Sequence, residues 1–190
     1  MPRKPTTSKA AMIDGAVRLI REQGHEELTV RRLASFLGCS TQPIMYHFAT
    51  VDCLKKAVYA RVDQQHTACL LRVPPGQDPV MAIGLNYVRF AVEEPRLFRF
   101  LFQTGYAEGV SLPELIESGE LQPVVRAMQA GAGLNEEQTK RVFLTVALFA
   151  HGYASLIANS GLAYDEKLAA KHLEQAWNGA VLAAAQEEAR

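Results

Sequence analysis

Residues 28–48 contain two short helical segments joined by a three-residue turn, and this arrangement constrains the fold most strongly. Thr29 can cap the first segment, which ends at Gly38, where a positive φ costs glycine little. Ser40 can cap the second segment. Ala34 lies inside the first segment, where a larger side chain would push the second helix away. The pattern predicts a helix-turn-helix, a motif whose second helix enters the major groove of DNA.

The rest of the sequence also follows the helical period, and no segment shows the sustained alternation of a strand bounded by hairpin turns. We therefore expect an all-α fold: a three-helix head of residues 1–56, with the helix-turn-helix at about 29–48, joined to a helical-bundle body of residues 57–190. A helix should start at Pro113, and Pro123 can kink or divide it.

The two ends of the chain differ in charge, although the whole chain balances 20 Lys and Arg against 20 Asp and Glu. Residues 1–60 hold nine basic and five acidic side chains, which leaves eleven and fifteen for the remainder, or +4 against −4. A basic N-terminal third favours nucleic acid or another anionic surface as its partner. Ordinary sampling variation can also produce a bias of this size.

Residues 142–158 are apolar except at Thr145, His151, Gly152 and Ser155. A membrane span is the alternative interpretation, but the stretch is at the lower length limit and the polar residues interrupt it. A helix buried on more than one face fits better, with one face toward the core and one toward a partner subunit. Together with the last helix it predicts a four-helix bundle between two chains, hence a homodimer without a membrane.

Residues 9–60 resemble the DNA-binding head of the TetR family of transcriptional regulators. The matching positions are Gly24, Leu28, Thr29, Arg31, Leu33, Ala34, Leu37, Gly38, Ser40, Ile44, His47, Phe48 and Leu54. The run Ala-Leu-Phe-Ala-His-Gly at 147–152, followed by Leu156, also resembles a ligand-domain helix of one TetR subgroup. The resemblance implies a ligand-responsive regulator, most often a repressor. Such a regulator binds a palindromic or pseudo-palindromic double-stranded DNA operator as a homodimer and is released by a small-molecule effector.

The resemblance also implies DNA contacts, together with one compensating lysine, at eight positions: Thr29, Arg31, Thr41, Gln42, Pro43, Tyr46, His47 and Lys55. Thr29 and His47 would contact phosphates, and Arg31 can hold a guanine through two hydrogen bonds. The amide of Gln42 can pair with adenine, and the ring of Pro43 offers an apolar contact to a thymine methyl group.

Two positions depart from the family pattern. Met45 stands where the family commonly has a tyrosine that contacts the DNA backbone or a base. Val51 stands where the family commonly has a phosphate-binding lysine. Tyr46, one residue later, can partly replace the first contact, and Lys55, one helical turn further on, can compensate for the second. Both departures put the contact pattern in question more than the function.

The body should also enclose a small-molecule pocket, because the family body does so and the region is rich in large apolar groups. The candidate lining residues are Asn86, Phe90, Phe98, Phe102, Met128 and His151. The competing interpretation is ordinary core packing, which is the usual role of aromatic residues at helical spacing. Asn86 and His151 are the more pointed candidates, since a polar group in an apolar setting needs a partner.

Enzyme chemistry has little support in the sequence. It holds no nucleophile elbow, metalloprotease motif or phosphate-binding loop, so we expect no catalytic residues, metal or cofactor. Three cysteines without Cys-x-x-Cys pairing, and no signal-peptide pattern, favour the cytoplasm. The hypothesis from another class is a helical small-molecule carrier or sensor, in which the helix pair serves only packing.

Overall fold

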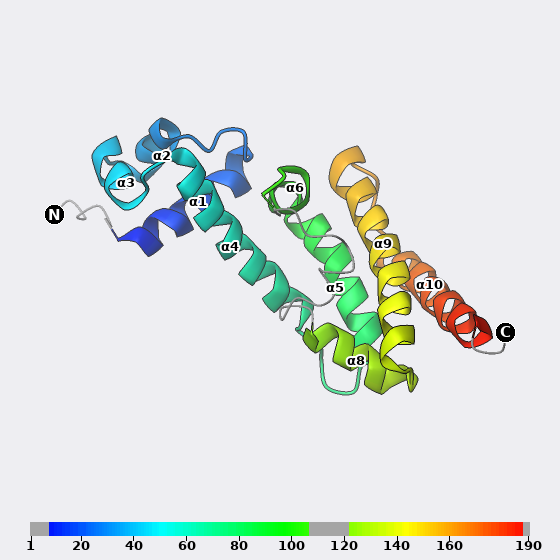
Figure 1. Cartoon of the computed structure of the whole chain (residues 1–190). Helices are drawn as coiled ribbons and strands as arrows, with labels where there is room; N and C mark the ends of the chain where they lie inside the picture. Colours follow the sequence, from blue (N-terminus) through cyan, green and yellow to red (C-terminus); the bar gives the residue numbers. More distant parts are fainter. Residues whose placement is uncertain (1–7, 107–121, 188–190) are drawn as a thin grey trace. The chain divides into compact units, whose positions relative to one another are not determined.

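The computed structural model describes residues 8–106 and 122–187, which form helices joined by turns without any strand (Figure 1). The predicted all-α fold is confirmed. The start of the helix expected at Pro113 lies outside the described residues. The helices are α1 (Lys9–Gln23), α2 (Val30–Leu37), α3 (Thr41–His47), α4 (Val51–Leu70), α5 (Pro79–Glu93), α6 (Pro95–Gln103), α8 (Gln122–Ala132), α9 (Glu136–Ser160) and α10 (Glu166–Glu187).

The chain forms two compact units. Within the described residues, the head unit comprises 8–66 and 94–106, which hold α1 to α3, most of α4, and α6. The body unit comprises 67–93 and 122–187, which hold the end of α4, then α5 and α8 to α10. The boundary expected at residue 56 falls inside α4, which continues without a break to Leu70.

Local side-chain chemistry sets the helix ends in the head unit. The hydroxyls of Ser8, Thr29 and Thr50 each accept a backbone N–H in the first turn of α1, α2 and α4, at 3.1–3.2 Å. Ser40 precedes α3 as expected, but its side chain makes no capping hydrogen bond. Gly38 ends α2 with φ 66°, in the left-handed region that glycine adopts without a Cβ penalty.

Apolar side chains between α1, α2 and α3 hold the helix pair in place. Leu33 of α2 and Ile44 of α3 are fully buried, and Phe48 after α3 is nearly so. Gly15 lets α1 approach α2 closely, because a Cβ there would lie 2.5 Å from Cδ2 of Leu37. Burying a side chain of this size stabilises a fold by about 1.5–3 kcal/mol, so these contacts fix the orientation of the short helix α3.

Helix α6 also belongs to the head unit. The guanidinium of Arg21 on α1 binds both carboxylate oxygens of Glu94, at 2.8 and 2.9 Å. Arg96 at the start of α6 donates to the backbone carbonyls of Arg21 and Glu22. Phe98 and Phe100 of α6 are buried. The start of α6 is therefore attached to the end of α1.

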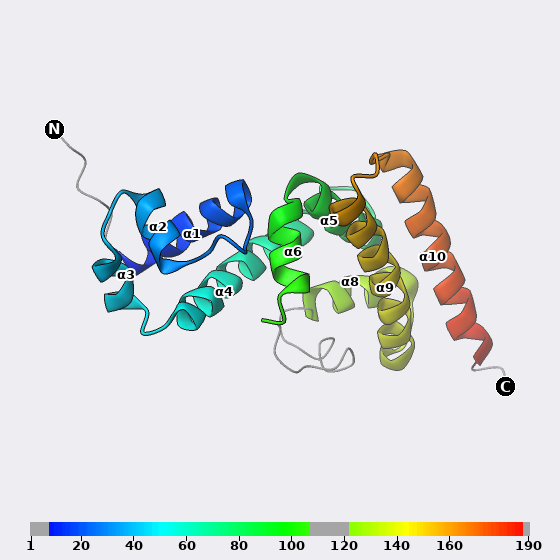
Figure 2. The same cartoon turned by 90° about the horizontal axis from the view of Figure 1, so that it is seen from above.

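Helix α9 is central to the body unit, where it packs against α5, α8 and α10. Figure 2 shows α9 and α10 running alongside each other. The side chain of Asn135 and that of Gln138 form a reciprocal capping box at the start of α9, with two bonds of 2.9 Å. By length and composition α9 could cross a membrane. A helix that packs against three neighbours in a protein core meets the same criteria.

Candidate functional site

The exposed side of α3 is one continuous arc of the helix. Ile44 is buried, and successive residues of an α-helix turn by about 100°. Going around the helix from Ile44, the side chains of Thr41, Met45, Gln42 and Tyr46 follow one another at about 60°, 100°, 160° and 200°, within an arc of about 140°. All four are exposed, whereas Pro43 and His47, which lie between Tyr46 and Ile44 at about 260° and 300°, are half-buried. We call the four residues Thr41, Gln42, Met45 and Tyr46 the α3 arc.

The α3 arc combines one amide with two large apolar groups. Tyr46 is 84% exposed and Met45 44%, so two large side chains adjacent in the sequence both lie at the surface. The ring of Tyr46 meets the ring of His47 edge-on, with centroids 5.1 Å apart. The Gln42 amide has no hydrogen-bond partner among the described residues. The arc therefore offers an open amide and an apolar surface to whatever contacts α3.

Two neighbouring arginines on α2 are in different situations. The Nε of Arg32 donates to the Glu27 carboxylate at 2.9 Å. Arg31 is exposed and forms no ion pair within residues 8–106 and 122–187. Its guanidinium is therefore available for an outside partner.

Other predicted contact positions lie on the same unit. The Thr29 hydroxyl accepts the N–H of Arg32, and its own hydrogen remains available for donation. Lys55 is half-buried on α4 and has no ion pair in the described part of the chain, whereas Lys56 lies 3.9 Å from Asp52. The head unit thus carries two positively charged side chains without an ion pair in the described residues, Arg31 on α2 and Lys55 in the second turn of α4.

Sequence reasoning assigned the thymine-directed apolar contact to Pro43 and treated Met45 as a departure from the pattern. In the structure Met45 lies within the exposed arc, and Pro43 lies at its edge. The helical period relative to the buried Ile44 does not separate the two residues, because Pro43 and Met45 lie about 100° from it on opposite sides; only their burial in the folded head does.

The six expected pocket residues do not come together in one unit. Phe98 and Phe102 are on α6 in the head unit, where their ring centroids are 4.8 Å apart. Asn86, Phe90, Met128 and His151 are in the body unit. The Asn86 amide donates to the backbone carbonyls of Leu70 and Arg72, at 3.2 and 3.0 Å, and so closes the turn between α4 and α5.

His151 has a specific polar partner. Its Nδ1 lies 2.8 Å from the hydroxyl of Tyr87, which links α9 to α5. Burial lowers the pKa of His151, because desolvation penalises the imidazolium form. A neutral ring accepts at one nitrogen and donates at the other, so the pair can act as a hydrogen-bonding group between apolar helices.

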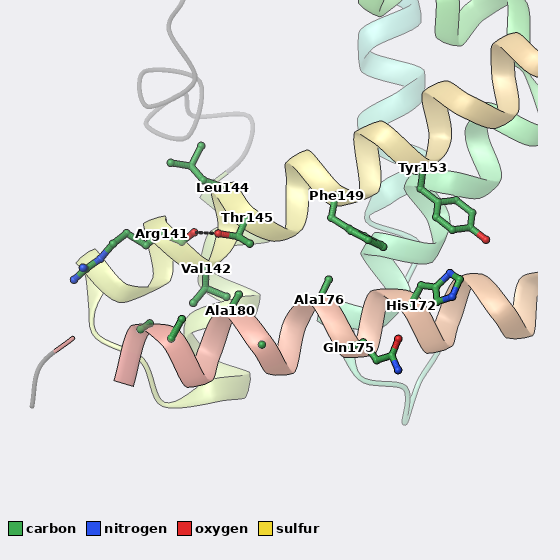
Figure 3. Close-up of a pocket in the computed structure, with 13 residues that line it drawn as sticks. Arg141, Val142, Leu144, Thr145, Phe149, Tyr153, His172, Gln175, Ala176 and Ala180 are labelled. Carbon is green, nitrogen blue, oxygen red and sulfur yellow. Dashed lines mark hydrogen bonds between the residues drawn. The ribbon is translucent and has the colours of Figure 1, made fainter. Parts of the chain in front are cut away.

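A groove of about 980 Å³ runs between α9 and α10. Figure 3 shows Phe149 and Tyr153 from α9 and His172, Ala176 and Ala180 from α10 along it. Its lining comes from these two helices alone, and α10 contributes mainly small residues.

Comparison with known proteins reveals similarity in sequence. A model of the "Tetracyclin repressor-like, C-terminal domain" family matches residues 80–178. An uncharacterized HTH-type transcriptional regulator of Mycobacterium tuberculosis is 27% identical over 154 residues, which cover 78% of this chain and 69% of that protein.

Solved structures agree with the fold. A TetR-family regulator from Streptomyces coelicolor superposes with a TM-score of 0.73 at 17% identity, covering 94% of this chain and 82% of that one. A TetR variant from Acinetobacter baumannii in complex with minocycline gives 0.58 at 18% identity, covering 95% and 96%. With a family match over more than half its length and a helix-turn-helix head, the chain belongs to the TetR family of transcriptional regulators.

Proposed function

We propose that this regulator is a repressor that binds a palindromic operator as a homodimer, with the α3 arc in the major groove of each half-site. The observation that carries the proposal is the presence, on the same helix pair of the described head unit, of an exposed Gln42 amide and an exposed Arg31 guanidinium that has no ion pair within the described residues. An amide can hold adenine, and a guanidinium can hold guanine or phosphate. The contacts assigned to Thr29, His47 and Lys55 would position the head on the DNA backbone.

Exposed apolar residues on α9 and α10 support the homodimer. Leu156 of α9 is 60% exposed and Leu182 of α10 61%, an unfavourable state for large side chains in water. A Cβ added at Gly152 or Gly179 would meet nothing within 4 Å, so neighbours within the chain do not require glycine there. A second copy packed on the groove between α9 and α10 would cover these residues. This pairing also assigns the exposed apolar side of α9 to protein rather than to lipid.

The dimer gives the regulator its mechanism. Two heads bind one face of DNA when they enter major grooves about 34–36 Å apart. A small molecule that binds the body more tightly in another head spacing would release the DNA, in proportion to its differential affinity for the two states. We place the effector contact at the hydrogen-bonded pair of Tyr87 and His151 in the body unit; of these two residues, His151 is one of the six predicted from the sequence to line the pocket.

The remaining assignments follow from this role. A DNA-binding repressor acts where the chromosome is, so we place the protein in the cytoplasm, where its free Cys39, Cys53 and Cys69 stay reduced. Regulation of this kind needs binding and no bond-making, so we assign no enzyme activity.

A reporter assay tests the proposal. The DNA that flanks this protein's own gene is placed before a reporter gene, in a host without the protein. Expression of the wild-type chain should lower the reporter signal, and Gln42→Ala should restore it. Gln129→Ala, which removes an exposed glutamine from α8, is the matched control and should repress like wild type. An unchanged reporter signal with wild type, and no binding to any selected duplex, would favour the carrier hypothesis instead.

A further inference from the structure

The α3 arc contains an apolar half that the hydrogen-bonding role of Gln42 leaves unused. Met45 is 44% exposed and lies between Thr41 and Gln42 on the arc, and Tyr46 completes it. Because successive residues turn by about 100°, Met45 and Tyr46 flank Gln42 on both sides. An occupant that pairs with the amide would therefore also meet the thioether on one side and the aromatic ring on the other.

The charge carried by the other helices of the head unit indicates which occupant fits this apolar surface. Arg31 is exposed without an ion pair in the described residues, and Lys55 is likewise without one. An apolar protein partner would leave these cations without a counter-charge. Double-stranded DNA supplies phosphates for the cations and, inside its major groove, one apolar group: the C5-methyl of thymine.

The hydrogen-bonding and apolar halves of the arc select the same base pair. Gln42 can hold adenine through N6 and N7, and the thymine opposite or next to it presents its methyl group in the same groove. Methionine is flexible and polarisable, so its side chain can adapt to a methyl group at an adjacent step. Met45 would thus offer an apolar contact at the position where the family commonly has a tyrosine.

We propose that Met45 recognises a thymine C5-methyl group in an A·T pair of each operator half-site, beside the base held by Gln42. The proposal rests on the proposed function of the α3 arc as a DNA-binding surface. On this proposal, the thymine methyl groups of the operator contribute to affinity through Met45, in addition to the hydrogen bonds that Gln42 and Arg31 make.

The test begins with selection of bound duplexes from a random-sequence pool by the wild-type protein, at about 0.15 M salt. In the enriched sequence, each thymine is then replaced by deoxyuridine, which removes the methyl group and keeps the base-pairing edge. We expect one thymine per half-site to be sensitive, with a loss of about three- to fivefold in affinity for each methyl removed.

The Met45→Ala variant assigns the sensitivity to its residue. In this variant, the thymine and deoxyuridine duplexes should bind equally at the sensitive position, although both bind less tightly than thymine DNA binds the wild type. Arg32→Ala is the control, because it leaves the α3 arc intact and should preserve the full difference between the two duplexes. Met45 is outside the core, so circular dichroism should show an unchanged fold.

The outcomes separate the inference from the function beneath it. An enriched sequence whose affinity is indifferent to deoxyuridine at every position would overturn the methyl recognition and leave operator binding standing. Sensitivity that persists in Met45→Ala and disappears in Tyr46→Ala would overturn the assignment to Met45. A pool without any enriched sequence would overturn both the inference and the proposed function.

Discussion

Arg31 and Arg32 are adjacent on α2, and their different surroundings predict different effects on DNA binding. Arg32 is held by Glu27 at 2.9 Å, whereas Arg31 has no ion pair in the described residues. We expect Arg31→Ala to weaken specific binding strongly and Arg32→Ala to weaken it slightly. Both substitutions remove one positive charge from the same helix, so the comparison cancels the general effect of net charge.

The magnitude follows from the presence of Arg31 in both heads of a dimer. Removal of an arginine that holds a base costs about 1–3 kcal/mol for each half-site. With one such arginine in each half-site, the affinity of the dimer should fall between about 30-fold and 10⁴-fold. Neither substitution should alter the free energy of unfolding by more than about 0.5 kcal/mol, because Arg31 is exposed and the ion pair of Arg32 is at the surface.

Fluorescence anisotropy with the selected duplex and with a scrambled one measures the effect. Arg31→Ala should reduce the ratio of specific to scrambled affinity while the dependence on salt changes little, as expected for a base contact. A loss of equal size on both duplexes, with a smaller salt slope by about one, would instead indicate a phosphate contact. Equal affinities of the Arg31→Ala and Arg32→Ala variants would show that the ion pair of Arg32 with Glu27 does not decide which arginine binds DNA.

Three further predictions concern stability and assembly. Burial lowers the pKa of His66 to about 4 from 6.5. As pH falls, the unfolded state therefore binds a proton at this histidine before the folded state does. The free energy of unfolding of the wild type, measured with urea, should fall by about 2 kcal/mol between pH 8 and pH 5 relative to that of His66→Phe. An equal pH dependence of the two proteins would contradict this prediction. Leu182→Glu places a charge in the proposed α9–α10 interface and should shift the protein toward monomer in sedimentation equilibrium. Leu71→Glu, which changes an exposed leucine outside that interface, should not. A wild-type chain that is monomeric at micromolar concentration would rule out the interface. Ile44→Ala should destabilise the head by about 2–5 kcal/mol in thermal unfolding, and Met45→Ala on the same helix should change it little.

The helix ends of the head were predictable from sequence because they depend on local chemistry. A threonine that accepts the N–H of the third residue along, and a glycine in the left-handed region, leave signals within a few positions of the chain. As expected, Thr29 caps the start of α2 and Gly38 lies at its end. Ser40 shows the limit of such signals, because its position before α3 is right and its capping hydrogen bond is absent.

The composition of the α3 arc could not be settled in the same way. Which side of α3 is exposed depends on how α3, with its buried Ile44, packs against the separate helices α1 and α2. Sequence reasoning therefore favoured Pro43 by its chemistry, whereas packing places Met45 on the open side. The order of residues alone does not orient so short a helix.

Polar residues of the body illustrate the same difference. The sequence indicated that Asn86 and His151 need partners, and both have them. It could not indicate that Asn86 binds carbonyls of the preceding turn while His151 meets Tyr87 on another helix. Similarly, nothing in the spacing of Phe98 and Phe102 showed that α6 belongs to the head unit.

Recognition of a specific DNA sequence by the α3 arc can be measured by titration of the DNA that flanks this protein's gene. The labelled duplex is titrated with wild-type protein at about 0.15 M salt, against a scrambled duplex of the same length. We predict binding at least about 10³-fold tighter to the flanking DNA, with two chains per duplex, and loss of that preference in Gln42→Ala. Equal, weak binding to both duplexes, unchanged by Gln42→Ala, would show that the α3 arc does not recognise this sequence.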